Sequence, residues 1–237
     1  SKTAFEPIAP LPGGAGVARS SHTAAVLGDG RALIAGGFNN GNPLNTAFLF
    51  DNRTNSWSAA YTMLSARGGH TATLINKGPN AGNALICGGQ TGADYTAAGA
   101  ITETCEIFDA LTDAFKPAAS MAAARMNHAA AALSSGNIFI SGGMQWDGAA
   151  STFTYLADNE IYDAGNNTWG PVTALLQGRA YHAITTINNG NIMITGGYNG
   201  VNFFNLTTEE KWYYDGIVAG IAGIIAQHAG SHGYLDA

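Results

Sequence analysis

The chain has 237 residues, of which 32 are glycine and only 11% are charged, and its formal net charge is −6. The lysines and arginines form no basic run, so the sequence lacks the clustered positive charge that nucleic-acid binding requires. No apolar run reaches the ~20 residues of a membrane-spanning helix, and the length and glycine content suit one all-β domain with many tight turns.

The first strand-like segment, residues 4–9, precedes any repeat. Its sequence, Ala-Phe-Glu-Pro-Ile-Ala, closely matches Ala-Phe-Lys-Pro-Ala-Ala at residues 114–119. The match indicates that residues 4–9 are a fourth, outer sheet strand that lacks the three strands it should accompany.

From residue 19 onward, four markers recur in a fixed order. The first is Arg-x-x-His, at Arg19 and His22, Arg67 and His70, Arg125 and His128, and Arg179 and His182. The second is a double glycine beginning at positions 36, 88, 142 and 196, so successive copies lie 52, 54 and 54 residues apart. The third is an aspartate, at Asp51, Asp109, Asp163 and Asp215. The fourth is an aromatic six positions after the first three of these aspartates, at Trp57, Phe115 and Trp169. This regularity indicates a true repeat.

Within one repeat, residues 125–169, glycine and asparagine turns separate four short strand-like runs. The combination of Arg-x-x-His, apolar strand, Gly-Gly, Tyr-Asp and a following aromatic resembles the kelch repeat, in which each repeat forms one four-stranded blade of a β-propeller. The resemblance implies an all-β fold, a β-propeller of four kelch-type blades over residues 1–215. Kelch propellers more often have six or seven blades.

The last repeat lacks its fourth strand, because Ile221 stands where the aromatic is expected. We therefore expect residues 4–9 to complete this blade and close the ring within one chain, which would hide the unpaired strand edges. Two alternatives stay open. The N-terminal strand, which contains Phe5, inserts into a neighbouring molecule, or the chain is part of a longer protein.

The tail at residues 216–237 belongs to no repeat and begins with an apolar run of 11 residues, too short to span a membrane. On a helix, one face of this run would carry Ile217, Ile221, Ile224 and Ile225. An apolar segment outside a closed domain needs a cover, so the tail either folds back on the propeller or docks into a neighbour; we favour the neighbour, because exposed apolar segments mark interfaces.

The loops after the double glycines are the candidate binding face, since loops on a rigid scaffold commonly carry binding residues. They contain aromatic residues among asparagine and glycine, and the candidates are Phe38, Tyr95, Trp146, Tyr155, Tyr198 and Phe203. Such residues suit stacking on sugar rings or packing against another protein. The alternative is that they pack on their own blade.

The motif's arginines and histidines recur in every blade, which favours a structural role in tying each blade to the next. A four-fold histidine ring holding a metal or anion is the alternative, but nothing in the spacing selects it. We therefore predict no metal and no cofactor.

Cys87 and Cys105 are the only cysteines and fall on adjacent predicted strands of the second repeat. A disulfide between them would fit an oxidising compartment and close the loop from 88 to 104. Two buried free thiols are an equal alternative. The low lysine content also favours a secreted or cell-surface protein.

The functional prediction is a non-catalytic interaction or structural module, self-associating through the tail or the N-terminal strand, with other copies of itself or another protein as partner. A glycan-binding propeller is the second reading. The third is an oxidase, because the chain resembles the kelch propellers of copper radical (galactose-oxidase-like) enzymes. Those enzymes need a cysteine joined to a tyrosine and extra domains, and this chain offers Cys105 but no added domain. No Gly-x-Ser-x-Gly motif or phosphate loop is present.

Overall fold

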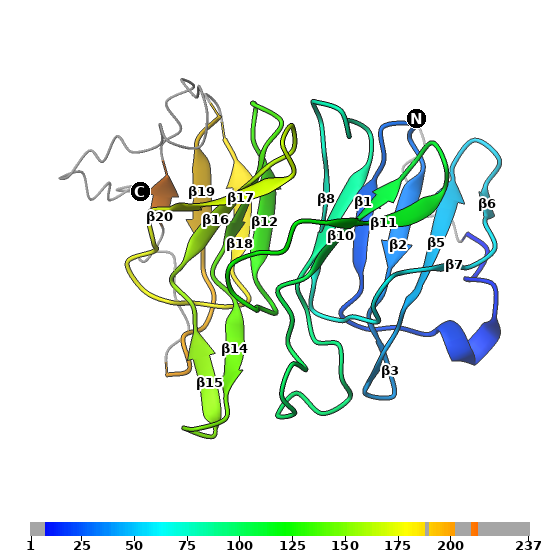
Figure 1. Cartoon of the computed structure of the whole chain (residues 1–237). Helices are drawn as coiled ribbons and strands as arrows, with labels where there is room; N and C mark the ends of the chain where they lie inside the picture. Colours follow the sequence, from blue (N-terminus) through cyan, green and yellow to red (C-terminus); the bar gives the residue numbers. More distant parts are fainter. Residues whose placement is uncertain (1–7, 188–189, 202–209, 213–237) are drawn as a thin grey trace, which may run out of the picture.

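The computed structural model describes residues 8–187, 190–201 and 210–212. In these ranges the chain forms short antiparallel strands and a single 3-10 turn of helix, η1 (Gly14–Val17), so the all-β prediction is confirmed. The described residues contain no helix long and apolar enough to cross a membrane. Four main sheets follow one another along the chain, one for each sequence repeat, and we call them blades 1 to 4 (Figure 1).

The strands of each blade pair in sequence order. Blade 1 contains β1 (Thr23–Val26), β2 (Ala32–Ala35), β5 (Thr46–Asp51) and β6 (Ser56–Trp57), with β7 (Tyr61–Thr62) also paired to β5. Blade 2 contains β8 (Thr71–Leu74), β9 (Ala84–Cys87), β10 (Cys105–Asp109) and β11 (Ala114–Ala118). Blade 3 contains β12 (Ala129–Ala132), β13 (Ile138–Ser141), β16 (Asn159–Asp163) and β17 (Thr168–Val172). Blade 4 contains β18 (Ala183–Thr186), β19 (Ile192–Thr195) and β20 (Glu210–Trp212).

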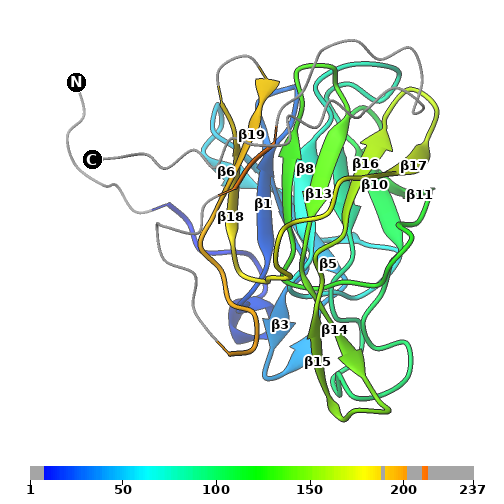
Figure 2. The same cartoon turned by 90° about the vertical axis from the view of Figure 1, so that its left-hand side faces the viewer.

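Two further hairpins arise in the connections that follow the double glycines. They are β3 (Phe38–Asn39) with β4 (Asn42–Pro43) in blade 1, and β14 (Met144–Asp147) with β15 (Thr152–Tyr155) in blade 3. Both hairpins extend from the same end of the molecule, the lower end in Figures 1 and 2. The connections after the double glycines therefore gather on one face.

The aspartate marker is explained by the turn after the third strand. Asp163 Oδ1 accepts a hydrogen bond from the backbone N–H of Gly165 (2.9 Å), and Asn167 then adopts a left-handed backbone with φ of 55°. Asp51 and Asp109 make the same bond to the residue two positions on. Aspartate forms such turns readily, because its side chain substitutes for a backbone acceptor.

The aromatic marker is explained by pairing across the two outer strands. Trp169 of β17 lies opposite Tyr162 of β16, with ring centroids 5.1 Å apart. The Trp169 indole N–H also donates to the carbonyl of Ala119 (2.7 Å), in the segment that leads into blade 3. In blade 1, Trp57 packs 5.0 Å from Phe50 in the same way. Phe108 and Phe115 make the corresponding contact in blade 2, so blades 1, 2 and 3 each carry an aromatic contact at the outer edge.

The hydrophobic core lies between the blades. The innermost strands pack in the order β1, β8, β12 and β18, and they are rich in alanine, which allows close approach. One buried cluster joins blades 1 and 2, a second joins blades 2 and 3, and a third joins blades 3 and 4. Stability therefore depends on contacts between neighbouring blades, as in repeat proteins.

Ring closure within the chain is not confirmed. Figure 1 shows blade 1 and blade 4 on opposite sides of blades 2 and 3. Among the described residues, no backbone hydrogen bond joins blade 4 to blade 1. Ile8 and Ala9 belong to no strand, and the rest of the proposed closing strand, including Phe5, lies outside the described residues. Phe203 and the tail residues Ile217, Ile221, Ile224 and Ile225 also lie outside them.

Candidate functional site: blade junctions and the loop face

The arginine of each motif ties together the strands of its own blade. In blade 2, Arg67 is buried and forms an ion pair with Glu106, with Nη2 and Oε1 3.0 Å apart. Arg67 Nη1 also donates to the carbonyls of Gly88 (2.7 Å) and Thr104 (3.0 Å). These bonds anchor the start of the blade to the double glycine at the end of its second strand.

Blade 3 repeats this arrangement, and blade 1 departs from it. Arg125 pairs with the buried Glu160 (Nη2 to Oε1, 2.7 Å) and donates to the carbonyl of Gly142 (2.7 Å). In blade 1, Phe48 stands where the other two blades have glutamate, and the guanidinium carbon of Arg19 lies 5.1 Å from its ring centroid. A cation–π contact thus takes the place of the ion pair.

Two of the motif's histidines, His70 and His128, form hydrogen bonds to the neighbouring blade. His70 Nε2 of blade 2 lies 2.8 Å from Thr23 Oγ1 of blade 1, and His128 Nε2 of blade 3 lies 2.9 Å from Thr71 Oγ1 of blade 2. Burial lowers the pKa of His70 to about 3, and the charge of Arg67 acts in the same direction. The ring is therefore neutral at pH 7.

These contacts place the histidines between blades rather than around an ion. Within the described ranges, no group of three or more His, Cys, Asp or Glu side chains is arranged to hold a metal. The arginine side chains therefore hold the strands of one blade together, and His70 and His128 bond one blade to the next.

Lowering the pH is expected to destabilise the fold already at pH values well above those at which carboxylates titrate. Burial lowers the pKa of His70 to about 3 and that of His182 to about 4, and it lowers the pKa of His128 far below its ordinary value. Unfolded histidine titrates near ~6.5, so below that pH the unfolded chain binds more protons. Each buried histidine then removes up to about 1.4 kcal/mol of stability per pH unit.

Urea unfolding at pH 7.5, 6.5 and 5.5 measures this slope. Burial raises the pKa of Glu106, and this carboxyl therefore acts in the opposite direction to the histidines. The variant His128→Gln should lose about a third of the slope, since it removes one of three titrating groups. A free energy of unfolding that is constant from pH 7.5 to 5.5 would contradict the prediction.

The two cysteines form a disulfide across β9 and β10. Cys87 and Cys105 are directly opposite in the strand register, their Cα atoms are 4.2 Å apart, and both are buried. Because Cys105 is engaged in this bond, it is not available for a link to tyrosine of the kind that copper radical oxidases use.

Removing the disulfide with the double variant Cys87→Ala/Cys105→Ala is expected to lower the free energy of unfolding by about 2–4 kcal/mol, because the bond restricts the unfolded chain. Urea unfolding of the variant, and of the parent protein with a reductant, gives two independent values that should agree. Alkylation of the denatured parent should add two groups only after reduction. A variant as stable as the parent would count against the prediction.

The loop face consists of the connections that follow the double glycines: residues 38–45, 90–104, 144–158 and 198–201. Its centre is an aromatic cluster formed by two blades. Tyr95 from blade 2 lies 5.5 Å from Trp146 and 5.1 Å from Phe153, both from blade 3, measured between ring centroids. Tyr155 of blade 3 lies 5.6 Å from Tyr198 of blade 4. The aromatic residues therefore bridge neighbouring blades instead of packing only on their own.

These ring contacts involve four of the six predicted binding residues: Tyr95, Trp146, Tyr155 and Tyr198. Phe38 is not part of them, and Phe203 lies outside the described residues. Trp146 and Tyr155 rest on a buried layer that includes Met126 and Met144. Tyr95 stays 40% exposed at the surface of the cluster. Phe38 packs instead against the backbone at Gly68, where a Cβ atom would lie 2.2 Å from its ring.

Sequence reasoning missed three contributors. Phe153 was among the loop aromatics but not among the candidates, although it contacts both Tyr95 and Trp146. Glu106 and Glu160, the partners of the buried arginines, were also missed. Their signal was present, since each stands three positions before the aspartate marker of its blade.

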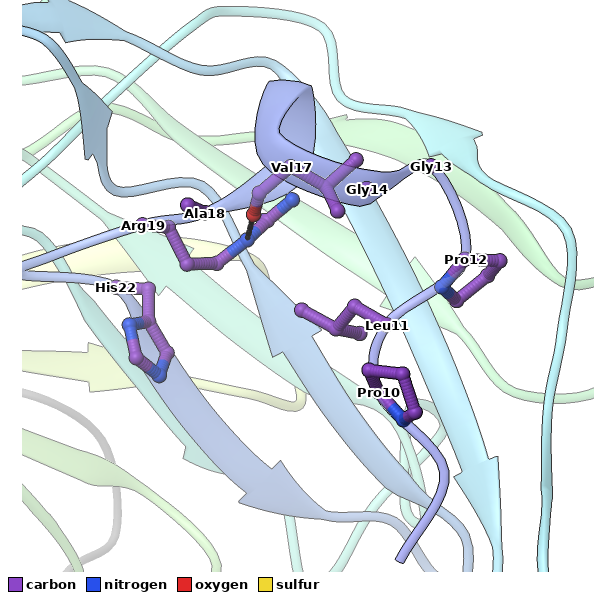
Figure 3. Close-up of a pocket in the computed structure, with 9 residues that line it drawn as sticks. All are labelled: Pro10, Leu11, Pro12, Gly13, Gly14, Val17, Ala18, Arg19 and His22. Carbon is purple, nitrogen blue, oxygen red and sulfur yellow. Dashed lines mark hydrogen bonds between the residues drawn. The ribbon is translucent and has the colours of Figure 1, made fainter.

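A hollow of about 670 Å³ lies beside the first motif, at the side of blade 1 away from blade 2 (Figure 3). Its walls are residues 10–14 on one side and Val17, Ala18, Arg19 and His22 on the other. Arg19 Nε donates to the Val17 carbonyl (3.0 Å), which holds the guanidinium at the edge of the hollow.

Four successive antiparallel blades that pack face to face and present loops on one side define a propeller-type repeat protein, and surfaces of this kind serve as protein-interaction modules. Residues 21–215 match the family described as the KLHDC2/KLHL20/DRC7 Kelch-repeats domain. The chain belongs to this kelch-repeat family, which confirms the resemblance seen in the sequence.

One curated protein and one solved structure are also similar to this chain. The "Kelch repeat-containing protein kel-10" of Caenorhabditis elegans is 27% identical over 163 residues, covering 69% of this chain and 26% of the relative. The matched part thus spans about a quarter of that protein. A solved structure titled "Structure of YjhT" is 16% identical with a TM-score of 0.48, covering 84% of this chain and 82% of the other.

Proposed function

We propose that this chain is a non-catalytic interaction module that binds a protein partner through its loop face. The observation that carries the proposal is the cluster of Tyr95, Trp146 and Phe153, which joins loops of two blades at the surface. Aromatic side chains with little conformational freedom are enriched at the centres of protein interfaces. The blades beneath hold the loops rigidly, which lowers the entropic cost of binding.

The compartment and self-association remain parts of this proposal. A secreted or cell-surface location is supported by the Cys87–Cys105 disulfide, because such bonds persist in oxidising environments. Self-association through Phe5 or through the isoleucines of the tail rests on the sequence pattern alone.

Site-specific photo-crosslinking tests the loop face. A benzophenone amino acid is introduced at Tyr95, 40% exposed on the loop face, or at Leu111, 93% exposed in the outer turn of blade 2. Irradiation in extracts and culture fluid of the source organism should give discrete protein adducts at position 95 and none at 111. The adducts should disappear when Trp146→Ala is added. Equal labelling at the two positions would argue against a binding role for this face.

Glycan binding is the second candidate, favoured by the exposed ring of Tyr95 at the rim of the cluster, where a sugar ring can stack. A glycan array probed with the parent protein and with Trp146→Ala and Tyr198→Ala distinguishes the two. Array signals lost in both variants, together with no protein adduct at position 95, would replace the protein-partner proposal by a lectin.

A further inference from the structure

Each of the three junctions between described blades is built from the same backbone contacts. The N–H of the second glycine in one blade donates to the arginine carbonyl of the next: Gly37 to Arg67 (2.8 Å), Gly89 to Arg125 (2.9 Å) and Gly143 to Arg179 (2.8 Å). The junction is therefore directional. A blade offers its double glycine on one side and its Arg-x-x-His motif on the other.

A second row of contacts runs through the residue before each histidine. Gly69 N–H donates to Ser21 O (3.0 Å), Asn127 N–H to Gly69 O (2.8 Å), and Tyr181 N–H to Asn127 O (2.9 Å). All four residues have a left-handed backbone, with φ between 50° and 65°. This shared conformation turns one N–H toward the preceding blade and one C=O toward the following blade, so the row passes from blade to blade.

The histidine ring fits against the first glycine of the preceding blade. A Cβ atom at Gly36 would lie 2.7 Å from Cε1 of His70, and one at Gly88 would lie 2.8 Å from Cε1 of His128. Only glycine at position 36 or 88 leaves room for the histidine ring of the next blade. We call this complementary contact the socket: it consists of the histidine ring, the glycine on which the ring rests and the two backbone hydrogen bonds. Only the matching side of another blade fits it.

Among the described residues, blades 1 and 4 each present one half of this socket without a matching blade. In blade 1, His22 is exposed, whereas His70, His128 and His182 are 5–7% exposed. Within the described part of the chain, the Ser21 N–H has no hydrogen-bond partner, and neither has the Tyr181 C=O at the other end of the row. In blade 4, Ala183 is exposed at the position where Thr23 of blade 1 contacts the next histidine.

We propose that a second copy of this chain supplies the missing neighbour, with blade 4 of one copy docked against blade 1 of the other in the junction geometry of blades 1 to 4. This surface is distinct from the loop face. His22 of one copy would rest on the Gly196 of its partner copy, and the Tyr181 carbonyl of that copy would accept the Ser21 N–H. The hollow beside Arg19 and His22 is the space into which the incoming blade edge fits (Figure 3).

The contact joins two different surfaces, so it is heterologous. It closes into a ring only if the rotation that relates neighbouring copies is suitable. Two copies joined at both ends would make a ring of about eight blades, within the range of about 4–8 blades that propellers span. Closure of the ring by one chain is the competing arrangement, and the same experiment detects it.

Cysteine cross-linking between different variants tests the head-to-tail contact. His22→Cys and Ala183→Cys are prepared separately; both positions are exposed, and the native cysteines are already bonded to each other. Mixing the two variants under mild oxidation should give a disulfide-linked pair joined between positions 22 and 183, while each variant alone stays unlinked. The double variant His22→Cys/Ala183→Cys should link between copies.

Light scattering on the unmodified chain provides the second readout. The expected mass is twice the 24.3 kDa of one copy. Ala183→Arg, with its bulky charge at the proposed contact, should weaken association at least tenfold, and the control Leu111→Arg in the outer turn should not. Circular dichroism verifies that both variants fold. A single-copy mass without cross-linking, or a link within one chain in the double variant, would overturn the proposal.

Discussion

Replacing Arg125 with methionine is expected to lower the free energy of unfolding by about 3–5 kcal/mol, because it leaves the buried carboxylate of Glu160 without its partner. Arg125 is fully buried, with its Nη2 2.7 Å from Glu160 Oε1. The same substitution deprives the Gly142 carbonyl of its donor. The loss is measured by urea unfolding at pH 7.

A matched control distinguishes the cost of breaking the buried ion pair from the cost of removing any arginine. Arg53 also forms an ion pair, 3.0 Å from Asp51, but its side chain is 72% exposed. Arg53→Met should therefore cost no more than about 1 kcal/mol. The double variant Arg125→Met/Glu160→Met should recover part of the loss, since no charge is left buried. Equal effects of the two single arginine substitutions would contradict the stabilising role given to the buried ion pair of blade 3.

Substituting Gly142 with alanine is expected to separate blade 3 from blade 4. The added Cβ would lie 2.5 Å from the Arg179 carbonyl and 2.8 Å from the ring of His182, and the residue has a left-handed φ of 57°. The conformation costs about 1–2 kcal/mol for a residue with a side chain, and the overlap adds about 1–3 kcal/mol. Hydrogen exchange should show faster exchange at the Gly143 amide, which bonds to Arg179.

Gly41→Ala isolates the conformational part of this effect. Gly41 also has a left-handed backbone, with φ of 79°, yet nothing lies within 4 Å of its added Cβ. This variant should lose only the conformational cost of about 1–2 kcal/mol, with the blade 3 to blade 4 amides unchanged. If Gly142→Ala unfolds at the same urea concentration as Gly41→Ala, the glycine is not a packing requirement of the junction.

The markers predicted the strands well because each marker residue interacts with its near neighbours in the sequence or in the adjacent strand. Asp163 forms a turn with its own neighbours, and Trp169 faces Tyr162 in the adjacent strand. Such short-range rules can be read from spacing alone. The double glycines were also informative, since positive φ and close packing both exclude larger side chains at these positions.

Features that depend on distant parts of the chain were harder to predict. The pairing of Arg67 with Glu106 joins residues 39 positions apart, and only the folded blade brings them together. The aromatic cluster was predicted as a set of residues but not as contacts, because Tyr95 and Trp146 belong to different blades. Closure by residues 4–9 rested on a sequence match, and a match cannot say how the outer blades are oriented.

The row of bonds through Ser21, Gly69, Asn127 and Tyr181 uses backbone groups only, so it places few demands on the side chains it connects. A duplicated repeat inserted between two existing ones would arrive with both halves of its junction already in place. The length of such an array can therefore change by whole repeats during evolution, while the outer strands and loops diverge independently. The repeats of this chain already differ in side chain while the row is kept: Phe48 stands where blades 2 and 3 have glutamate, and Ala129 stands where blades 1 and 2 have threonine.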